Sequence, residues 1–153
     1  MTGAVVIEGD DFYAGGSNTA WDARSPQDKV ANAMDWRRQR ALLAELRLGA
    51  GASWFPFDWT SFDDATLAAE ALHCGPADVI ILEGAYCARP ELGELIDFRV
   101  LLDTPQHICM TQLRAREGDD YSEDWESRWR EAEDYYFGKI MPRSAFDLVI
   151  DGS

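Results

Sequence analysis

Short apolar runs alternate along the chain with longer stretches in which apolar residues recur at helical spacing. Four runs have the length and composition of buried strands, and they cover residues 4–8, 78–82, 98–102 and 146–150. The stretches between them predict helices over residues 26–48, 64–73 and 106–116, and a long helix from the acidic turn at 117–120 to about residue 136. The aromatic segment 53–59 contains a proline and fits an edge strand or a loop wall. The alternation predicts one α/β domain over residues 1–153, with a mostly parallel sheet and helices on both faces.

Acidic residues follow three of the predicted strands. Asp10 and Asp11 come after the first strand, Glu83 after the second and Asp103 after the third. Because the carboxyl ends of parallel strands meet at one edge of a sheet, we expect these four side chains to converge where ligands bind. Carboxylate oxygens are ligands for Mg²⁺, and a carboxylate beside a hydroxyl group can accept its proton during phosphoryl transfer. The alternative is that such residues cap the following helices or face solvent.

The charge balance narrows the choice of partners. The chain has 28 acidic and 14 basic residues and a net charge of −14, which disfavours nucleic acid and anionic membranes as partners. No apolar run approaches the roughly 20 residues of a membrane span, so we expect a cytoplasmic protein. A small anionic ligand would need a local group of arginines. Three such groups exist, and they are Arg37 with Arg38 and Arg40, Arg114 with Arg116, and Arg128 with Arg130.

Seven short motifs span almost the whole chain. They are Gly9-Asp10-Asp11-Phe12-Tyr13, Met34-Asp35-Trp36, Phe57-Asp58-Trp59, Val79 to Gly84, Leu102-Asp103-Thr104, Arg114-Ala115-Arg116-Glu117, and Pro142 with Phe146 to Ile150. In order and spacing they resemble the uridine kinase and phosphoribulokinase group of P-loop kinases, which includes nicotinamide riboside kinases. The resemblance implies a P-loop NTPase-like three-layer sandwich. It also implies transfer of a phosphoryl group from ATP, with Mg²⁺, to a hydroxyl group of a small nucleoside-like acceptor.

The resemblance also implies roles for individual residues of this sequence. Asp10 matches the aspartate that activates the acceptor hydroxyl group, and Glu83 matches the acid that holds Mg²⁺ directly or through water. The positions that match acceptor-binding residues are Asp11, Tyr13, Asp35, Phe57 and Trp59. Aromatic faces suit a planar ring because stacking adds to the free energy of burial. Filling of the hydrophobic core is the alternative role for Phe57 and Trp59.

Residues 105–140 correspond to the helical region that carries a mobile lid in these kinases. Arg114 and Arg116 lie where lid arginines clamp the transferring phosphoryl group, a role that suits the fixed donor fork of a guanidinium. The alternative for both is a solvated helix face that pairs with Glu117. By the same resemblance, we expect Arg143 to contact ATP. Trp125, Trp129 and Tyr136 have the spacing of a helix-packing stripe.

The resemblance further implies a strand, a GxxxxGK[ST] loop and a helix ahead of residue 4. The sequence contains no such loop, whose amides and lysine would hold the β- and γ-phosphates of ATP, so we expect poor ATP binding by this chain. The implied strand would lie in the middle of the sheet, between strands 78–82 and 98–102, and without it their apolar surface is uncovered. The simplest explanation is a chain that lacks its N-terminus. The run Gly15-Gly16-Ser17-Asn18 predicts a flexible turn and no substitute for the loop.

Two functions therefore stay open. The first is a kinase whose acceptor is a nucleoside, nicotinamide riboside, a pantothenate-like compound or a sugar. The second is a non-catalytic protein, derived from a kinase, that binds a small ligand or regulates another protein. The sequence does not decide whether like subunits assemble into a homo-oligomer.

Overall fold

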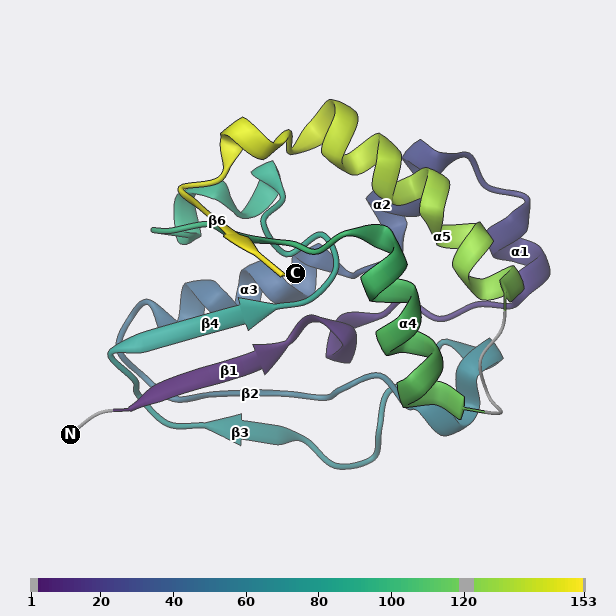
Figure 1. Cartoon of the computed structure of the whole chain (residues 1–153). Helices are drawn as coiled ribbons and strands as arrows, with labels where there is room; N and C mark the ends of the chain where they lie inside the picture. Colours follow the sequence, from purple (N-terminus) through teal and green to yellow (C-terminus); the bar gives the residue numbers. More distant parts are fainter. Residues whose placement is uncertain (1–2, 119–122, 153) are drawn as a thin grey trace.

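Two pairs of parallel strands and one antiparallel pair make up the β-structure of the computed structural model, which describes residues 3–118 and 123–152. The strand β1 (Ala4–Glu8) pairs in parallel with β4 (Val79–Glu83), and β5 (Val100–Asp103) pairs in parallel with β6 (Leu148–Asp151). The predicted α/β class with parallel strands is confirmed. In the described part of the chain β4 and β5 do not pair with each other, so the strands form three two-stranded sheets instead of one continuous sheet (Figure 1).

One face of the β1–β4 pair is covered by helix α3 (Trp36–Leu46). Leu42 and Leu46 of this helix pack in one core cluster with Ile7 of β1. The alternate positions point away from α3, and Val6 and Ile81 are 56% and 44% exposed. Helices were predicted on both faces of the sheet. Within the described residues, a helix covers only one face of the β1–β4 pair.

The predicted helix over 26–48 is two helices, α2 (Pro26–Asn32) and α3. The break occurs because Asp35 begins a new helix, with its carboxylate accepting a hydrogen bond from the Arg38 amide at 3.3 Å. The Asp35 amide donates to the carbonyl oxygen of Phe12 at 2.7 Å. The apolar periodicity runs through this break, which explains why one long helix was expected.

The predicted helix over 64–73 is wrong. A 3₁₀ segment, η2 (Trp59–Asp64), is followed by strand β3 (Leu72–Cys74), which pairs antiparallel with β2 (Ala52–Trp54). The chain between η2 and β3 runs back along the segment after β2 and exchanges backbone hydrogen bonds with it, such as Ala68 N–H to the Pro56 carbonyl at 2.8 Å. Tertiary pairing has overridden the helical preference of this alanine-rich stretch.

Helices α4 (Gln106–Glu117) and α5 (Glu123–Tyr135) occupy the predicted lid region, and α5 continues as a π-helix, η5 (Tyr136–Ile140). Tyr136 is 2% exposed and Trp129 packs against the same core cluster, whereas the side chain of Trp125 lies outside the described residues. No residue of α4 is buried. None of the described helices is long and apolar enough to cross a membrane.

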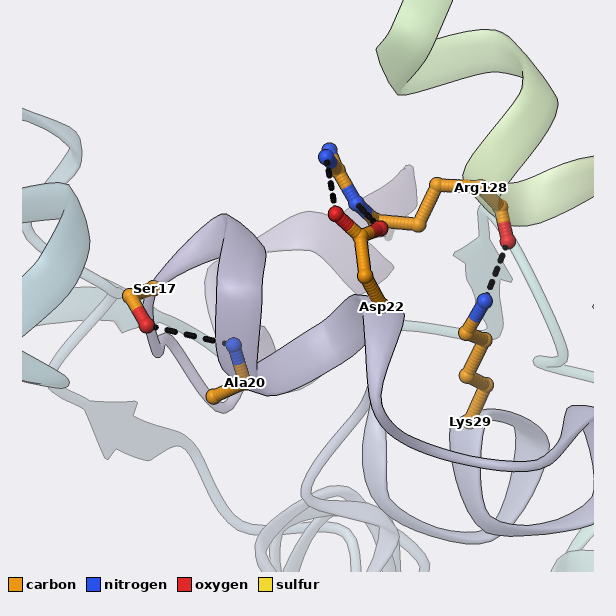
Figure 2. A network of polar contacts seen from close by, with 5 residues as sticks. All are labelled: Ser17, Ala20, Asp22, Lys29 and Arg128. Carbon is orange, nitrogen blue, oxygen red and sulfur yellow. Dashed lines mark hydrogen bonds and ion pairs between the residues drawn. The ribbon is translucent and has the colours of Figure 1, made fainter.

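The predicted turn at Gly15 to Asn18 leads into helix α1 (Asn18–Asp22), for which the sequence analysis made no prediction and which takes part in an anchor for α5. Ser17 caps α1 by accepting a hydrogen bond from the Ala20 amide at 3.3 Å. Figure 2 shows Asp22 facing Arg128 of α5, with Nε to Oδ1 at 2.5 Å, while Lys29 of α2 donates to the Arg128 carbonyl at 2.9 Å. The Arg128 and Lys29 residues are buried, so these contacts fix α5 to α1 and α2.

Candidate functional site

The ends of β1 and β4 approach each other closely at two glycines. A Cβ atom added to Gly9 would lie 2.6 Å from the Glu83 carbonyl oxygen and 2.7 Å from the Cys87 sulfur atom. Gly84 has a φ of +120° and lies against the Gly9 backbone. Glycine is therefore required at position 9 for steric reasons and favoured at position 84 by its backbone conformation. This approach brings the residues that follow both strands to one place.

Three of the four expected carboxylates share this place. Asp10 and Asp11 lie in the 3₁₀ turn η1 (Gly9–Phe12), and Glu83 ends β4 opposite Glu8. Asp10 reaches solvent, yet loss of hydration to the surrounding protein raises its pKa, the nearby Arg116 charge lowers it, and Asp11 raises it. Desolvation also raises the pKa of Glu83, followed by repulsion from Asp10, Glu8 and Asp11. The charge of Asp10 thus acts on Glu83, and the charges of Arg116 and Asp11 act on Asp10.

Asp103 does not join this group among the contacts of the described residues. It ends β5, pairs in register with Asp151 of β6 and forms an ion pair with Arg143. Arg143 lies in a 3₁₀ turn, η6 (Arg143–Ala145), with its side chain 65% exposed. Its predicted contact with ATP stays a prediction, since its charge is at present neutralised by Asp103.

The predicted aromatic residues cluster, but they pack against one another. The rings of Tyr13 and Trp59 stack with centroids 5.3 Å apart and an angle of 8° between planes. Phe57 contacts both at right angles, with centroids 5.1 Å from Tyr13 and 4.9 Å from Trp59. No planar ring fits between Tyr13 and Trp59 at this separation. Phe57 is 3% exposed, which matches core filling, whereas Trp59 is 49% exposed and offers a ring face to solvent.

The remaining acceptor-binding candidates are held by hydrogen bonds. The Asp11 carboxylate accepts from the Trp54 indole at 2.7 Å, and the Asp11 carbonyl oxygen accepts from the Phe57 amide at 2.8 Å. Asp11 thus positions the aromatic segment. Asp35 and Tyr13 line a pocket of about 430 Å³ between η1 and the first turn of α3. Tyr13 connects the pocket to the carboxylate group along the chain. Its amide donates to the Asp10 carbonyl oxygen at 3.1 Å within the same turn.

The two lid arginines face different surroundings. Arg116 is close enough to lower the pKa of Asp10, and it also pairs with Glu117 at 3.1 Å. Arg114 lines a second pocket, of about 380 Å³, between α4 and α5. Arg116 is therefore the lid arginine beside the carboxylates, whereas Arg114, two residues earlier, projects from a different side of α4, and the phosphoryl clamp stays a prediction.

The described residues fit Mg²⁺ better than they fit the triphosphate of ATP. No group of three metal-ligating side chains forms within residues 3–118 and 123–152. Mg²⁺ usually takes one or two protein carboxylates and completes its shell with water and phosphate oxygens, and Glu83 at the end of β4 is the carboxylate predicted to hold it, directly or through water. The sequence contains no glycine-rich phosphate loop, so the backbone amides and the lysine that would hold the β- and γ-phosphates are not assigned to residues of this chain.

The pocket is lined by two arginines that the sequence analysis did not assign to the site. Arg37 and Arg38 line the pocket beside Tyr13 and Asp35. The sequence showed that they belong to a group of arginines but did not show where this group lies in the fold. Their position directly after a helix-capping aspartate was the available signal, because the first turn of a helix projects side chains near its cap.

The chain was compared with protein families, curated proteins and solved structures. No family model matches it. It is 30% identical over 114 residues to a uridine kinase from Shewanella denitrificans, a match that covers 73% of this chain and 52% of that protein. The chain thus spans about half the length of this curated relative.

Two solved structures share the fold. One is a protein described as a possible uridine kinase from Bacillus stearothermophilus, with a TM-score of 0.69 and 20% identity, covering 98% of this chain and 73% of that chain. The other is assigned as a fructose transport system kinase from a Silicibacter species, with a TM-score of 0.65 and 20% identity, covering 96% and 74%. The structures establish the fold, the curated relative adds the sequence match, and the chain belongs to the uridine kinase and phosphoribulokinase-like family of P-loop kinases.

Proposed function

We propose that this chain forms the acceptor-binding and proton-accepting part of a kinase that transfers the γ-phosphoryl group of ATP to a hydroxyl group of a small metabolite. The observation that carries the proposal is the position of Asp10. Its carboxylate lies near Glu83 and Arg116, and its backbone carbonyl accepts a hydrogen bond from Tyr13 at the edge of the pocket. This arrangement supports Asp10 as the proton acceptor, with Glu83 nearby as the metal-binding carboxylate and the pocket reached through Tyr13, three residues along the chain.

Asp10 acts on the acceptor hydroxyl group. Desolvation raises its pKa, which strengthens the ionised carboxylate as a base. As the acceptor oxygen bonds to phosphorus, its proton passes to Asp10. ATP with Mg²⁺ supplies the phosphoryl group and leaves as ADP. Arg116 stabilises the negative charge that spreads over the transferring oxygens.

The test is phosphoryl transfer by this chain extended upstream through any in-frame GxxxxGK[ST] segment, with the unextended chain alongside. Radiolabelled ATP is offered with uridine, nicotinamide riboside, pantothenate and fructose. We expect transfer to at least one acceptor by the extended protein, and a loss of about 10²–10⁴-fold in Asp10→Asn. An extended protein that binds Mg·ATP and every acceptor without transfer contradicts the proposal.

A non-catalytic ligand-binding protein is the second candidate. The pocket that favours it is lined entirely by residues of this chain, between Tyr13 and Leu67 in sequence. Calorimetry separates the two candidates. Ligand binding with no ATP binding by either the short or the extended protein supports the second, and Mg·ATP binding by the extended protein alone supports the kinase.

A further inference from the structure

Most arginines of this acidic chain are neutralised by carboxylates. The ion pairs include Arg40 with Glu94, Arg128 with Asp22, Arg130 with Glu126, and Arg143 with Asp103. Within the residues that the structure describes, no carboxylate oxygen lies within 4.0 Å of a guanidinium nitrogen of Arg37 or Arg38. With a net charge of −14, two adjacent arginines without such partners are unusual for this molecule.

Contacts that leave the charge intact hold both arginines in place. The Arg37 guanidinium lies over the ring of Trp36, 4.4 Å from its centroid. Arg38 donates a hydrogen bond to the Phe55 carbonyl and lies 5.2 Å from the centroid of the Phe12 ring. Aromatic faces and a carbonyl oxygen orient a guanidinium but do not neutralise it. The positive charge of both side chains is therefore available to a ligand.

The pocket that they line has an excess of positive charge. Arg37 and Arg38 are opposed there by one carboxylate, that of Asp35, which is engaged by the Arg38 amide. The positive end of the α3 dipole lies at the same turn. The net negative charge of the chain repels anions, whereas the local charge of this pocket attracts them.

We infer that the acceptor of this protein carries an anionic group, a carboxylate or a phosphate, which Arg37 and Arg38 bind at the pocket. The inference rests on the proposed function, since it names the class of its acceptor. Guanidinium groups bind both oxyanions through paired hydrogen bonds. The acceptor hydroxyl group then extends along η1 towards Asp10, whose carbonyl oxygen is hydrogen-bonded to Tyr13 of the pocket. A neutral nucleoside would leave both guanidinium groups without a partner.

Binding to the unmodified chain, without ATP, tests the inference. Two matched pairs of probes are titrated by calorimetry at low salt: uridine against orotidine, which adds a carboxylate, and ribose against ribose 5-phosphate. We expect at least one anionic probe to bind about tenfold or more tightly than its neutral partner. Preference within the first pair alone indicates a carboxylate, and preference within the second alone indicates a phosphate.

Arg37→Gln and the double change Arg37→Gln/Arg38→Gln should remove this preference by weakening the binding of the anionic probe. Arg24→Gln is the matched control, because Arg24 also lies over a tryptophan ring, 4.0 Å from the centroid of Trp21, and does not line the pocket. Equal binding of both members of each pair, no binding of any probe, or equal effects of Arg24→Gln and Arg37→Gln would overturn the inference. Anion binding without phosphoryl transfer would refute the kinase alone. Transfer to neutral acceptors with no anion preference would refute this inference alone.

Discussion

At Asp10, one carboxyl group is subject to opposing influences. Desolvation and Asp11 raise its pKa, and Arg116 lowers it, with desolvation the largest effect. A raised pKa in the folded state means that the folded protein holds the proton more tightly than the unfolded chain does. Stability then falls as pH rises through the folded pKa, and ionised Asp10 destabilises the fold at neutral pH. A side chain that lowers the stability of the fold in this way is typical of a functional group.

Replacing Asp10 with asparagine should therefore separate stability from activity. We expect Asp10→Asn to slow phosphoryl transfer by the extended protein about 10²–10⁴-fold and to raise the melting temperature at pH 7. The gain should vanish as the pH falls below the ordinary aspartate pKa of 3.8, where the native carboxyl is protonated in both states. Scanning calorimetry across pH measures it. Glu45→Gln, at an exposed position near the C-terminal end of α3 and outside the pocket, should change neither quantity, and a fall in melting temperature for Asp10→Asn at pH 7 would contradict this account.

The second prediction for a single residue concerns the close packing around Gly9. Gly9→Ala places a methyl group 2.6 Å from the backbone oxygen of Glu83 and 2.7 Å from the Cys87 sulfur, so β1 and β4 must move apart. We expect a loss of about 1–3 kcal/mol in the free energy of unfolding, as is usual for overpacking, measured by urea denaturation. Gly75→Ala is the control, since nothing lies within 4 Å of its added Cβ atom. Equal stability of the two variants would show that the strand ends adjust freely.

The helices of the predicted lid region differ in how they are attached. Helix α5 buries Ala132 and Arg128 and is tied to α1 and α2, whereas α4 has no buried residue and carries Arg114 and Arg116. Few buried contacts mark the elements of a fold that open most easily. If residues 105–140 act as the predicted lid, we expect α4 to move and α5 to stay in place.

The anchor of α5 can be tested through Asp22. Asp22→Asn removes the carboxylate charge that pairs with the Arg128 guanidinium, whose side chain is 5% exposed, and we expect lower stability at pH 7 and faster amide exchange in α5. Its hydrogen bond with Arg128 lowers the pKa of Asp22, so the pair stabilises the fold above the ordinary aspartate pKa and the difference should disappear at acid pH. Asp97→Asn is the control, because Arg47 in that pair is 42% exposed and surface pairs contribute little. A larger loss from Asp97→Asn would refute the anchor.

Strands were easier to predict than helices in this chain. An apolar run such as 78–82 has one stable place in an α/β fold, and the first strand was predicted at its observed bounds, Ala4–Glu8. The helix breaks were missed because they depend on distant partners: Asp35 caps α3 while its amide binds Phe12, and the segment after η2 pairs with the chain around Pro56. Periodicity within one stretch contains no information about such partners.

The candidate site was predictable as far as sheet geometry determines it. Asp10, Asp11 and Glu83 converge because parallel strands end at one edge. Asp103 does not join them, because β5 belongs to a separate strand pair, and sequence pattern alone does not show which strands pair. The stacking of Tyr13 on Trp59 and the location of Arg37 in the pocket depend on side-chain packing, which requires the folded structure.

At the scale of the whole molecule, each pair of parallel strands exposes apolar side chains on one of its own faces. They are Val6, Val79, Ile81, Val100, Leu102, Leu148 and Ile150, between 43% and 68% exposed. Val6 is in register with Ile81, and Leu102 with Ile150, so within each pair these side chains lie on the same side. Apolar surface of this extent on strands with unpaired edges favours association with other protein.

We therefore expect the chain by itself to self-associate as its concentration rises, which sedimentation velocity would show. Leu102→Lys should shift the distribution towards monomer, because it places a charge on the exposed face where Leu102 is 68% exposed. Leu48→Lys is the matched control, since Leu48 is 83% exposed but follows α3 and lies on no strand. Equal dissociation by both changes would point to general solubility and not to the strand face. If extension of the chain upstream also abolished association, the added segment and a second copy of the chain would be competing for one surface, and self-association would report an uncovered fold and not a functional oligomer.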